Sequence, residues 1–378
     1  MIRNIGGKCR IIEDVYDVTM QRNRITRQTR EDFQNFYCNM LVTEGDKEIP
    51  AGHWWVRHPL RRSFEGITFN PGGDIPGTYN LWRGFSVEPV EGDCSLFLDH
   101  VRENICSGNR DHFAYLMGWM ATAVQKPDSP GQVAVVMRGK QGTGKSFFAK
   151  TFGSLFGRHF IQVSDPKHLV GSFNAHLRDC VVLFGDEAFF AGDRKHESIL
   201  KTLITEDTLS IEGKGVDMEQ CSNFVHLLLA SNSQWVIPAG PSERRYFAID
   251  VGDAKKQDTE YFLRIIKQLN NGGRQALLHT LMYYDLSGFE VRNVPKTLAL
   301  QEQKEISMTP EQEWWYGKLV DGRLMNSHGR WLRDISRAVI YNDYIEYCDQ
   351  LKINRRMPLQ RFLRVMELLC PGMNPNAV

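Results

Sequence analysis

The stretch GKQGTGKS, residues 139–146, decides the fold of this chain. It follows the apolar run VAVVM (133–137) and opens the helix-like segment KSFFAKTFGSLFG (145–157). The stretch fits the pattern G-x-x-x-x-G-K-[ST], in which glycines let backbone N–H groups curl around phosphate oxygens. A helix that begins directly after such a loop adds the partial positive charge of its N-terminus. The sequence therefore predicts a nucleotide site at the end of a buried strand.

Two residues of this loop have side chains with specific tasks. Lys145 is expected to reach the β- and γ-phosphates, and the Ser146 hydroxyl is expected to hold magnesium. The rest of the loop is expected to bind phosphate through its backbone, and the predicted nucleotide-binding residues there are Gly139, Gln141, Gly142, Thr143 and Gly144.

Three almost wholly apolar runs surround the loop in sequence: VAVVM (133–137), CVVLF (180–184) and FVHLLLA (224–230). They alternate with longer polar or helix-like stretches. Runs that are apolar on both faces are typical of a parallel sheet that is covered by helices on both sides. The sequence therefore predicts an α/β core.

Polar side chains follow the second and third of these runs. Asp186 and Glu187 end VVLFGDEA (181–188), where one carboxylate can orient a magnesium shell and the other can polarise an attacking water. Asn232 follows the third run, and its amide can bond both the γ-phosphate and that water if the third strand lies between the other two. The alternatives stay open: a pair of exposed loop acids, and an asparagine chosen only for a turn.

Composition excludes several classes of protein. The chain has 378 residues, a net charge of +1 and no apolar run long enough to cross a bilayer or serve as a signal peptide. Its eight cysteines are scattered without a CxxC pair, which indicates reduced thiols. We therefore expect a soluble intracellular protein with no membrane partner. A nucleic-acid partner would need a local basic patch, because the net charge of the whole chain is close to zero.

Breaks rich in Gly and Pro and changes in composition along the chain predict three domains. Residues 1–127 combine aromatic-rich loops with two helices, the first capped by Asp93 and the second by Asn109. Residues 128–286 form the α/β core and end in two helices separated by NNGG (270–273). Residues 287–378 are expected to be mainly helical, with a helix-turn-helix pair that could be winged-helix-like. On its second helix Arg361 and Arg364 are expected one turn apart, as a DNA contact or as a solvated basic face.

With these residues in view, the chain resembles the superfamily 3 helicases, which are AAA+-related ATPases of small viruses, phages and plasmids. It is similar in particular to the helicase part of phage primase-helicase and primase-polymerase proteins. The resemblance spans roughly residues 54–250. The segments that carry it occur in the order typical of the family: GKQGTGKS (139–146), VVLFGDEA (181–188), LKTLITEDTLSIEGKGVD (200–217), LLLASN (227–232) and SERRYFAID (242–250).

The resemblance implies a P-loop AAA+-like parallel-sheet ATPase with ATP and Mg²⁺ as cofactors. Lys145 and Ser146 match the first motif of the family, Asp186 and Glu187 match the second, and Asn232 matches the sensor motif. The segment IEGKGVD (211–217) matches a hairpin that family members project into a central pore. Lys214 there matches the residue that contacts single-stranded DNA, and a Gly-flanked lysine at a tight turn can reach a phosphate backbone. A solvated turn lysine is the alternative.

The resemblance also implies a homo-oligomeric, hexameric ring in which each nucleotide site is completed by an arginine from the neighbouring subunit. Arg244 and Arg245 match the position of that arginine. A guanidinium at the γ-phosphate offsets developing charge and raises the rate by about 10³ to 10⁵. Arg244 is the preferred candidate, with Arg245 holding the loop or sensing nucleotide in its own subunit; read alone, the pair also fits a solvated edge or a phosphate contact.

The chain departs from the family in residues 1–127, which are too short for a primase or polymerase domain and show no paired metal-binding carboxylates. Priming is therefore expected on another protein or on a longer parent chain. The function implied is an ATP-dependent DNA helicase of phage or mobile-element replication, in the cytoplasm of the host cell. The alternatives are an ATP-dependent initiator or loader, or a packaging-type module, that binds DNA without processive unwinding.

Overall fold

The computed structural model describes residues 1–5, 8–18, 22–165, 171, 174–187, 194–213, 216–324, 331, 335–354 and 356–371. The chain divides into two compact units. Unit 1 contains residues 1–237 and 244–300, and unit 2 contains residues 238–243 and 301–378. The domain limits 1–127, 128–286 and 287–378 stay predictions. No helix among the described residues is long and apolar enough to cross a membrane.

The centre of unit 1 is a five-stranded sheet with the order β14-β8-β13-β10-β9, and all of its pairings are parallel. Its strands are β8 (Ala134–Arg138), β9 (Phe160–Val163), β10 (Val182–Asp186), β13 (His226–Ser231) and β14 (Tyr246–Asp250). The three apolar runs form β8, β10 and β13, and all six residues of β13 are buried. The prediction of an α/β core with a parallel sheet is therefore confirmed.

The strand order decides which residues meet. Strand β13 lies between β8 and β10, which is the order that the interpretation of Asn232 requires. Because the strands are parallel, the residues that follow β8, β10 and β13 come together at the carboxyl edge of the sheet, where open α/β sheets bind their ligands. Strand β9 was not predicted, and it lies beyond β10 at one side of the sheet.

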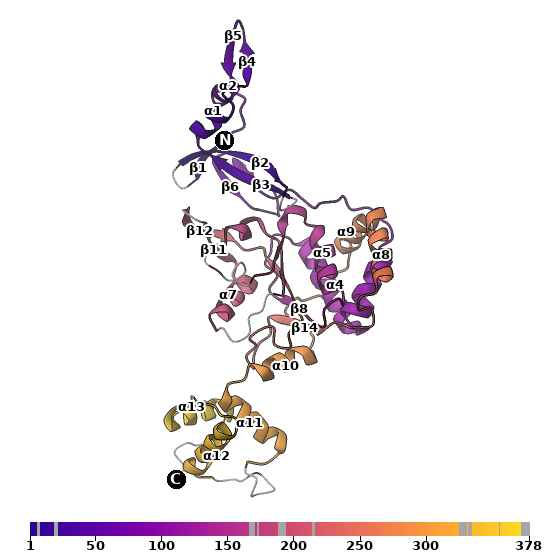
Figure 1. The fold of residues 1–378 in the computed structure, drawn as a ribbon, viewed down its shortest axis with the longest axis vertical. Coiled ribbons are helices and arrows are strands. Elements are labelled where there is room, and N and C mark those ends of the chain that lie inside the picture. The colour runs from indigo at the N-terminus through magenta and orange to yellow at the C-terminus, as the bar shows by residue number, and fades with distance from the viewer. Residues whose placement is uncertain are drawn as a thin grey trace. The chain divides into compact units, whose positions relative to one another are not determined.

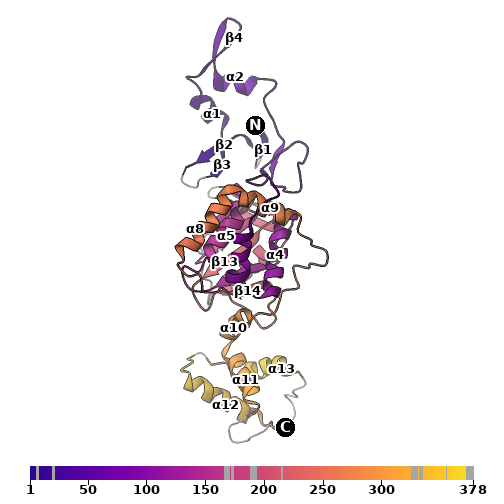
Figure 2. The ribbon, with the colours of Figure 1, turned by 90° about the vertical axis from the view of Figure 1, so that its right-hand side faces the viewer.

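Helices cover one side of the sheet, and α7 lies on the other side (Figure 1). Figure 2 looks onto the side that is formed by α4, α5, α8 and α9. The bounds are α4 (Arg110–Gln125), α5 (Lys145–Ser154), α7 (Arg194–Thr205), α8 (Thr259–Gln268) and α9 (Arg274–Met282). Helices α8 and α9 are separated by η4 (Leu269–Gly273), in which Gly272 has a φ of +96°. The predicted break at NNGG is therefore confirmed.

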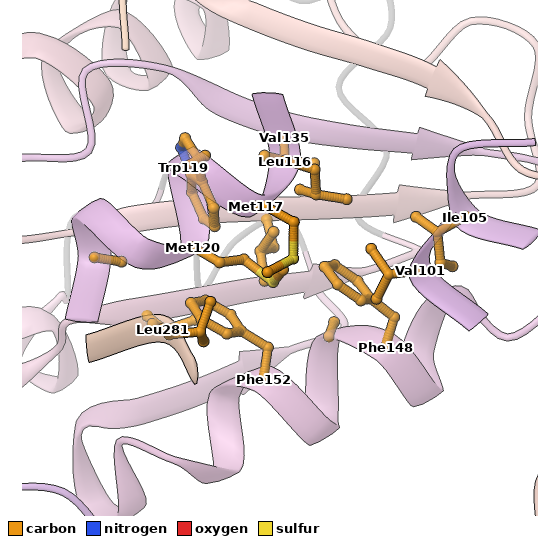
Figure 3. Close-up of a cluster of buried hydrophobic side chains, with 14 of the residues drawn as sticks. Val101, Ile105, Leu116, Met117, Trp119, Met120, Val135, Phe148, Phe152 and Leu281 are labelled. Atoms are coloured by element: carbon orange, nitrogen blue, oxygen red, sulfur yellow. The ribbon is translucent and has the colours of Figure 1, made fainter. Parts of the chain in front are cut away.

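One hydrophobic core joins these helices to the sheet. Figure 3 shows Trp119, Met120 and Leu116 of α4 beside Phe148 and Phe152 of α5. All five side chains are fully buried, and an apolar side chain of this size stabilises the fold by about 1.5–3 kcal/mol when buried. The indole N–H of Trp119 donates to the carbonyl oxygen of Val133 at 2.8 Å, so this polar group is satisfied inside the core.

The segment before α4 differs from its prediction as a single helix. It consists of α3 (Ser95–Asp99) and the π-helical turn η1 (His100–Ile105). The Asp93 carboxylate accepts the Ser95 N–H at 2.8 Å, although the residue at the cap position is Cys94. The predicted cap of α4 is confirmed, because the Asn109 side chain accepts the His112 N–H at 3.0 Å.

The N-terminal part of unit 1 holds an antiparallel sheet of order β1-β2-β3. The arginine-rich strand β3 pairs with β2. The aromatic-rich part contains helix and short strands as well as loops. The elements are β1 (Ile2–Ile5), β2 (Lys8–Asp17), β3 (Arg22–Gln28), α1 (Arg30–Phe36), β4 (Leu41–Glu44), β5 (Lys47–Pro50), α2 (Ala51–Arg57), β6 (Gly66–Thr68) and β7 (Thr78–Asn80).

Unit 2 is helical among its described residues, with α11 (Pro310–Asp321), α12 (Arg337–Gln350) and α13 (Leu359–Leu369); α10 (Leu298–Ile306) spans the limit between the units. Its core is built around Trp314, Tyr344 and Phe362. Helices α12 and α13 lie within residues 287–378, where the sequence predicts a helix-turn-helix pair. Arg361 and Arg364 are exposed on α13, and their contact with DNA stays a prediction.

Candidate functional site

The glycine-rich loop, residues 139–146, connects β8 to α5 at the carboxyl edge of the sheet. Gly142 and Gly144 have φ values of +80° and +93°, which a residue with a Cβ atom rarely adopts. A Cβ atom on Gly144 would also lie 2.6 Å from Cε1 of His100. The two glycines are therefore required by the path of the chain. The loop lines a cavity of about 570 Å³.

Lys145 is the first residue of α5, and its side chain is buried. Its Nζ donates to the carbonyl oxygens of Gly139 at 2.6 Å and Lys140 at 2.8 Å, and to Oδ1 of Asn232 at 2.9 Å. Burial lowers the pKa of Lys145, and the nearby carboxylates of Glu187 and Asp186 oppose this shift. The ammonium group of Lys145 is therefore held inside the loop, and its hydrogen-bond partners among the described residues are neutral oxygens.

Asp186 ends β10 beside the start of α5. Its Oδ1 accepts the Ser146 hydroxyl at 2.8 Å, and its Oδ2 accepts Nε2 of Gln162 at 3.0 Å. The hydroxyl and the carboxylate that were predicted to hold magnesium thus lie side by side. Gln162 was missed by the sequence reasoning, because its importance depends on β9 lying next to β10. A polar residue within the short run FIQV (160–163) was the one available signal.

Glu187 follows β10 in a strained backbone conformation, with a φ of +58°. Its N–H donates to the carbonyl oxygen of Ala230 at 2.9 Å, and its Oε2 accepts the Asn232 N–H at 3.3 Å. These bonds hold the exposed carboxylate of Glu187 against the end of β13. The predicted residues Lys145, Asp186, Glu187 and Asn232 therefore come together at one edge of the sheet.

Further residues line the same cavity outside the predicted motifs. They come from α5, from the segment after β9, from the segment before α8 and from α8 itself, and they are Phe147, Ser164, Gln257, Thr259 and Phe262. The backbone N–H of Gln257 donates to the carbonyl oxygen of Gly142 at 3.0 Å, so the segment before α8 is fixed to the loop. No spacing rule in the sequence connects residues so far apart.

Arg244 and Arg245 precede β14, at the opposite edge of the sheet from the glycine-rich loop. The direction is fixed by the far end of the strand, where Asp250 forms a two-point ion pair with Arg138, the last residue of β8. Five residues of strand separate Arg245 from that end, a distance of about 16 Å. Arg244 is exposed and Arg245 is half-buried. The structure thus places the two arginines away from the glycine-rich loop of their own chain.

The expected hairpin is present as an antiparallel pair, β11 (Thr208–Gly213) and β12 (Val216–Ser222). Lys214 belongs to the connection between these strands and lies outside the described residues. The register of Leu209 opposite Cys221 shows that the strands fold back on each other over most of their length. The role of Lys214 in DNA binding stays a prediction.

Comparison with known proteins finds a family model that matches part of the chain and a phage protein that is similar in sequence. Residues 137–245 match a family of unknown function, DUF5906. The match begins inside β8 and ends at Arg245, so it contains the glycine-rich loop and the carboxylates. Over 266 residues the chain is 27% identical to a DNA primase-polymerase of Nitratiruptor phage NrS-1. That alignment covers 65% of this chain and 35% of the relative, so the chain spans about a third of the relative's length.

Solved structures of that phage protein share the fold. One apo structure of the NrS-1 C-terminal region (305–718) aligns with a TM-score of 0.64 at 19% sequence identity, and it covers 83% of this chain and 76% of the solved chain. The A-form apo structure of the same region aligns with a TM-score of 0.65 at 17% identity, and it covers 93% and 90%. At these identities the likeness shows the fold alone.

Proposed function

We propose that this protein is an ATP-dependent, ring-forming DNA helicase of phage or mobile-element DNA replication. One observation carries the proposal: Lys145, Ser146, Asp186, Glu187 and Asn232 meet at the carboxyl edge of a parallel sheet, around a glycine-rich loop. This combination supplies phosphate binding, a metal site and a candidate base in one cavity. It is the arrangement that phosphoanhydride hydrolysis requires.

The phosphate-binding step is supported by Lys145. Its ammonium group bonds two backbone carbonyl oxygens and the Asn232 amide oxygen. A nucleotide phosphate would offer charged oxygens in place of these neutral ones, and charge-assisted hydrogen bonds are about twice as strong as neutral ones. We therefore assign Lys145 to the β- and γ-phosphates, together with the backbone N–H groups of the loop.

The donor atoms at Asp186 fit magnesium. The Ser146 hydroxyl and a carboxylate oxygen of Asp186 lie 2.8 Å apart, and both are the hard oxygen ligands that Mg²⁺ prefers. Gln162 orients the other carboxylate oxygen of Asp186. When bound there, the metal would neutralise charge on the phosphates. Asp186 would hold the shell of that ion, with Ser146 as its direct partner.

Glu187 is the proposed general base. Its carboxylate is exposed toward the cavity edge and is held beside Asn232. A water held between these two side chains would lose its proton to Glu187 as it attacks the γ-phosphate. Asn232 touches both Glu187 and Lys145, so its amide is placed to respond to the presence of the γ-phosphate.

The position of the arginines supports the proposal of a ring. The strand length between Arg245 and the loop edge is about 16 Å, more than a side chain of arginine spans. A catalytic contact by Arg244 or Arg245 therefore requires the nucleotide of a second copy of the chain. We assign this role to Arg244 and propose a hexameric ring in which hydrolysis depends on assembly.

The DNA-replication context is supported by the relative. The primase-polymerase of phage NrS-1 is an enzyme by its name, and structures of its C-terminal region share this fold. We propose that this chain acts with a primase or polymerase, on single-stranded DNA that Lys214 contacts in the ring's pore. Binding through phosphates would be sensitive to salt and largely independent of sequence.

Two measurements test the function. The rate of Mg²⁺-dependent ATP hydrolysis is measured with and without single-stranded DNA, and strand displacement is then measured on a forked duplex. We expect DNA-stimulated hydrolysis and ATP-dependent displacement. Stimulated hydrolysis without displacement would identify the initiator, loader or packaging-type module instead. Absence of any ATP turnover by the assembled protein would contradict both assignments.

A further inference from the structure

The rear of the glycine-rich loop rests on two buried polar side chains that none of the predicted motifs contains. Asn104 and His100 both belong to the π-helical turn η1, and their exposed fractions are 2% and 0%. The Asn104 Nδ2 donates to the carbonyl oxygen of Thr143 at 2.6 Å. The His100 ring lies so close to Gly144 that a Cβ atom there would be 2.6 Å from its Cε1.

The bond from Asn104 fixes the direction of a loop N–H group. In a trans peptide the C=O and the N–H point to opposite sides. Because Asn104 holds the carbonyl of Thr143 on the side of η1, the N–H of Gly144 is directed away from η1. Gly144 lines the cavity, and backbone N–H groups are what such a loop offers to phosphate. Gln257 holds the preceding peptide in the same way, through the carbonyl of Gly142.

Asn104 is itself positioned by its surroundings. Its backbone carbonyl accepts the N–H of Gly252 at 2.8 Å, which joins η1 to the segment after β14. Its side-chain oxygen is buried without a hydrogen-bond partner among the described residues. An unsatisfied buried oxygen is unfavourable. The amide at position 104 is therefore explained by the hydrogen bond that its Nδ2 donates to Thr143, and not by its oxygen. π-Helical turns are rare in proteins, and those that do occur are often found at functional sites.

The His100 side chain packs against Gly144 without adding a charge to the site. Its Nδ1 lies 3.1 Å from the hydroxyl of Tyr261, and its ring packs against Phe147 and Phe262. Burial lowers the pKa of His100 to about 4, and the backbone of Gly144 opposes that shift. The ring is therefore neutral at ordinary pH, and it limits the movement of Gly144 by contact.

We infer that Asn104 and His100 are positioning residues for the nucleotide, which hold the Thr143–Gly144 peptide in its phosphate-binding orientation. This inference rests on the proposed ATP site. It extends the site to a layer behind the loop, which acts on phosphate only through the loop's backbone.

The test compares ATP affinity with thermal stability in the wild-type chain and three variants. Asn104→Leu removes the donor at similar volume and is expected to raise the Kd for Mg·ATP about tenfold or more. The matched control is Asn223→Leu, which removes a buried amide bonded to the carbonyls of Leu203 and Glu206 in the same unit. Asn223→Leu is expected to lower the unfolding temperature as much as Asn104→Leu does, and to leave the Kd for Mg·ATP unchanged. Asn104→Ser, which keeps a small donor, is expected to recover part of the affinity.

The outcomes separate the inference from the proposed function. If the wild-type chain binds ATP and the folded Asn104→Leu variant binds it equally well, the inference is wrong and the ATP site stands. If the wild-type chain binds no ATP, the proposed site is wrong and the inference falls with it. Should Asn104→Leu not fold, His100→Asn serves as the second variant, with at least a severalfold rise in Kd expected and an unchanged Kd overturning the inference.

Discussion

Glu187 has a backbone conformation that a glutamate rarely adopts, with a φ of +58°. Such strain persists where the surrounding structure fixes it, and it is concentrated at functional sites. Here two hydrogen bonds with β13 and the residue after it, Asn232, fix the conformation. The strain at Glu187 therefore supports its assignment to catalysis over that of an ordinary loop acid.

Substitution of Glu187 by Gln tests that assignment. The amide keeps the shape of the side chain and removes its basicity, so ATP should still bind while its turnover falls about 10²- to 10⁴-fold. Turnover is measured by phosphate release and binding by a fluorescent ATP analogue. The control is Glu88→Gln, an exposed glutamate of unit 1, for which neither quantity should change. Unchanged turnover in Glu187→Gln would remove Glu187 from the mechanism.

Two buried histidines predict how the stability of the protein depends on pH. Burial lowers the pKa values of His100 and His226 to about 4, below the ordinary value near 6.5. The unfolded chain therefore takes up these protons at a higher pH than the folded chain. The free energy of unfolding should fall as the pH drops from about 6.5 toward 4, by up to about 1.4 kcal/mol per pH unit for each histidine.

The measurement is denaturant unfolding at several pH values between about 7 and 5. His226→Gln removes one of these two buried histidines, so its stability should decline less steeply with falling pH than that of the wild type. His53→Gln, at an exposed histidine, should keep the wild-type slope. Parallel profiles for wild type and His226→Gln would contradict the account.

At the scale of elements, the sequence was sufficient where local pattern decides the structure. The strands β8, β10 and β13 were predicted because each is apolar on both faces. The break between α8 and α9 was predicted from NNGG (270–273), where Gly272 takes a positive φ in the structure. Local pattern also identified the polar residues that end β10 and β13.

The sequence was insufficient where a contact joins distant elements. The π-helical turn η1 was expected as ordinary helix, because its geometry depends on packing behind the glycine-rich loop. Gln162 could not be assigned before β9 was known to pair with β10. The same holds for Phe262, which reaches the cavity from a helix more than a hundred residues beyond the loop.

A separate prediction concerns DNA binding by Lys214, between the strands of the β11–β12 hairpin. Lys214→Ala should remove the stimulation of ATP hydrolysis by single-stranded DNA and reduce the salt dependence of DNA binding, because one phosphate contact is lost. The control is Lys47→Ala, which lies beside the turn of the β4–β5 hairpin at Gly45. Lys47→Ala should leave both quantities unchanged. Intact stimulation in Lys214→Ala would mean that DNA is bound elsewhere.

At the scale of the whole molecule, the sheet separates the two halves of the proposed chemistry. The glycine-rich loop lies at the carboxyl edge, and Arg244 lies at the amino edge of β14. If the proposed function is right, the arginines of one chain complete the site of a second chain and cannot complete their own. Repeated head-to-tail contact between such chains produces a closed ring when the rotation permits closure. Assembly and hydrolysis are thus expected to be inseparable.

Mixing two inactive variants tests this central claim most directly. Lys145→Ala lacks the phosphate contact and keeps both arginines, while the double variant Arg244→Ala/Arg245→Ala keeps an intact loop. Each alone should be almost inactive in ATP hydrolysis. An equimolar mixture assembled on DNA should regain about a quarter of wild-type turnover, because random pairing joins an intact loop to an intact arginine at one interface in four. Full turnover by the arginine variant alone, or no recovery in the mixture, would contradict the account.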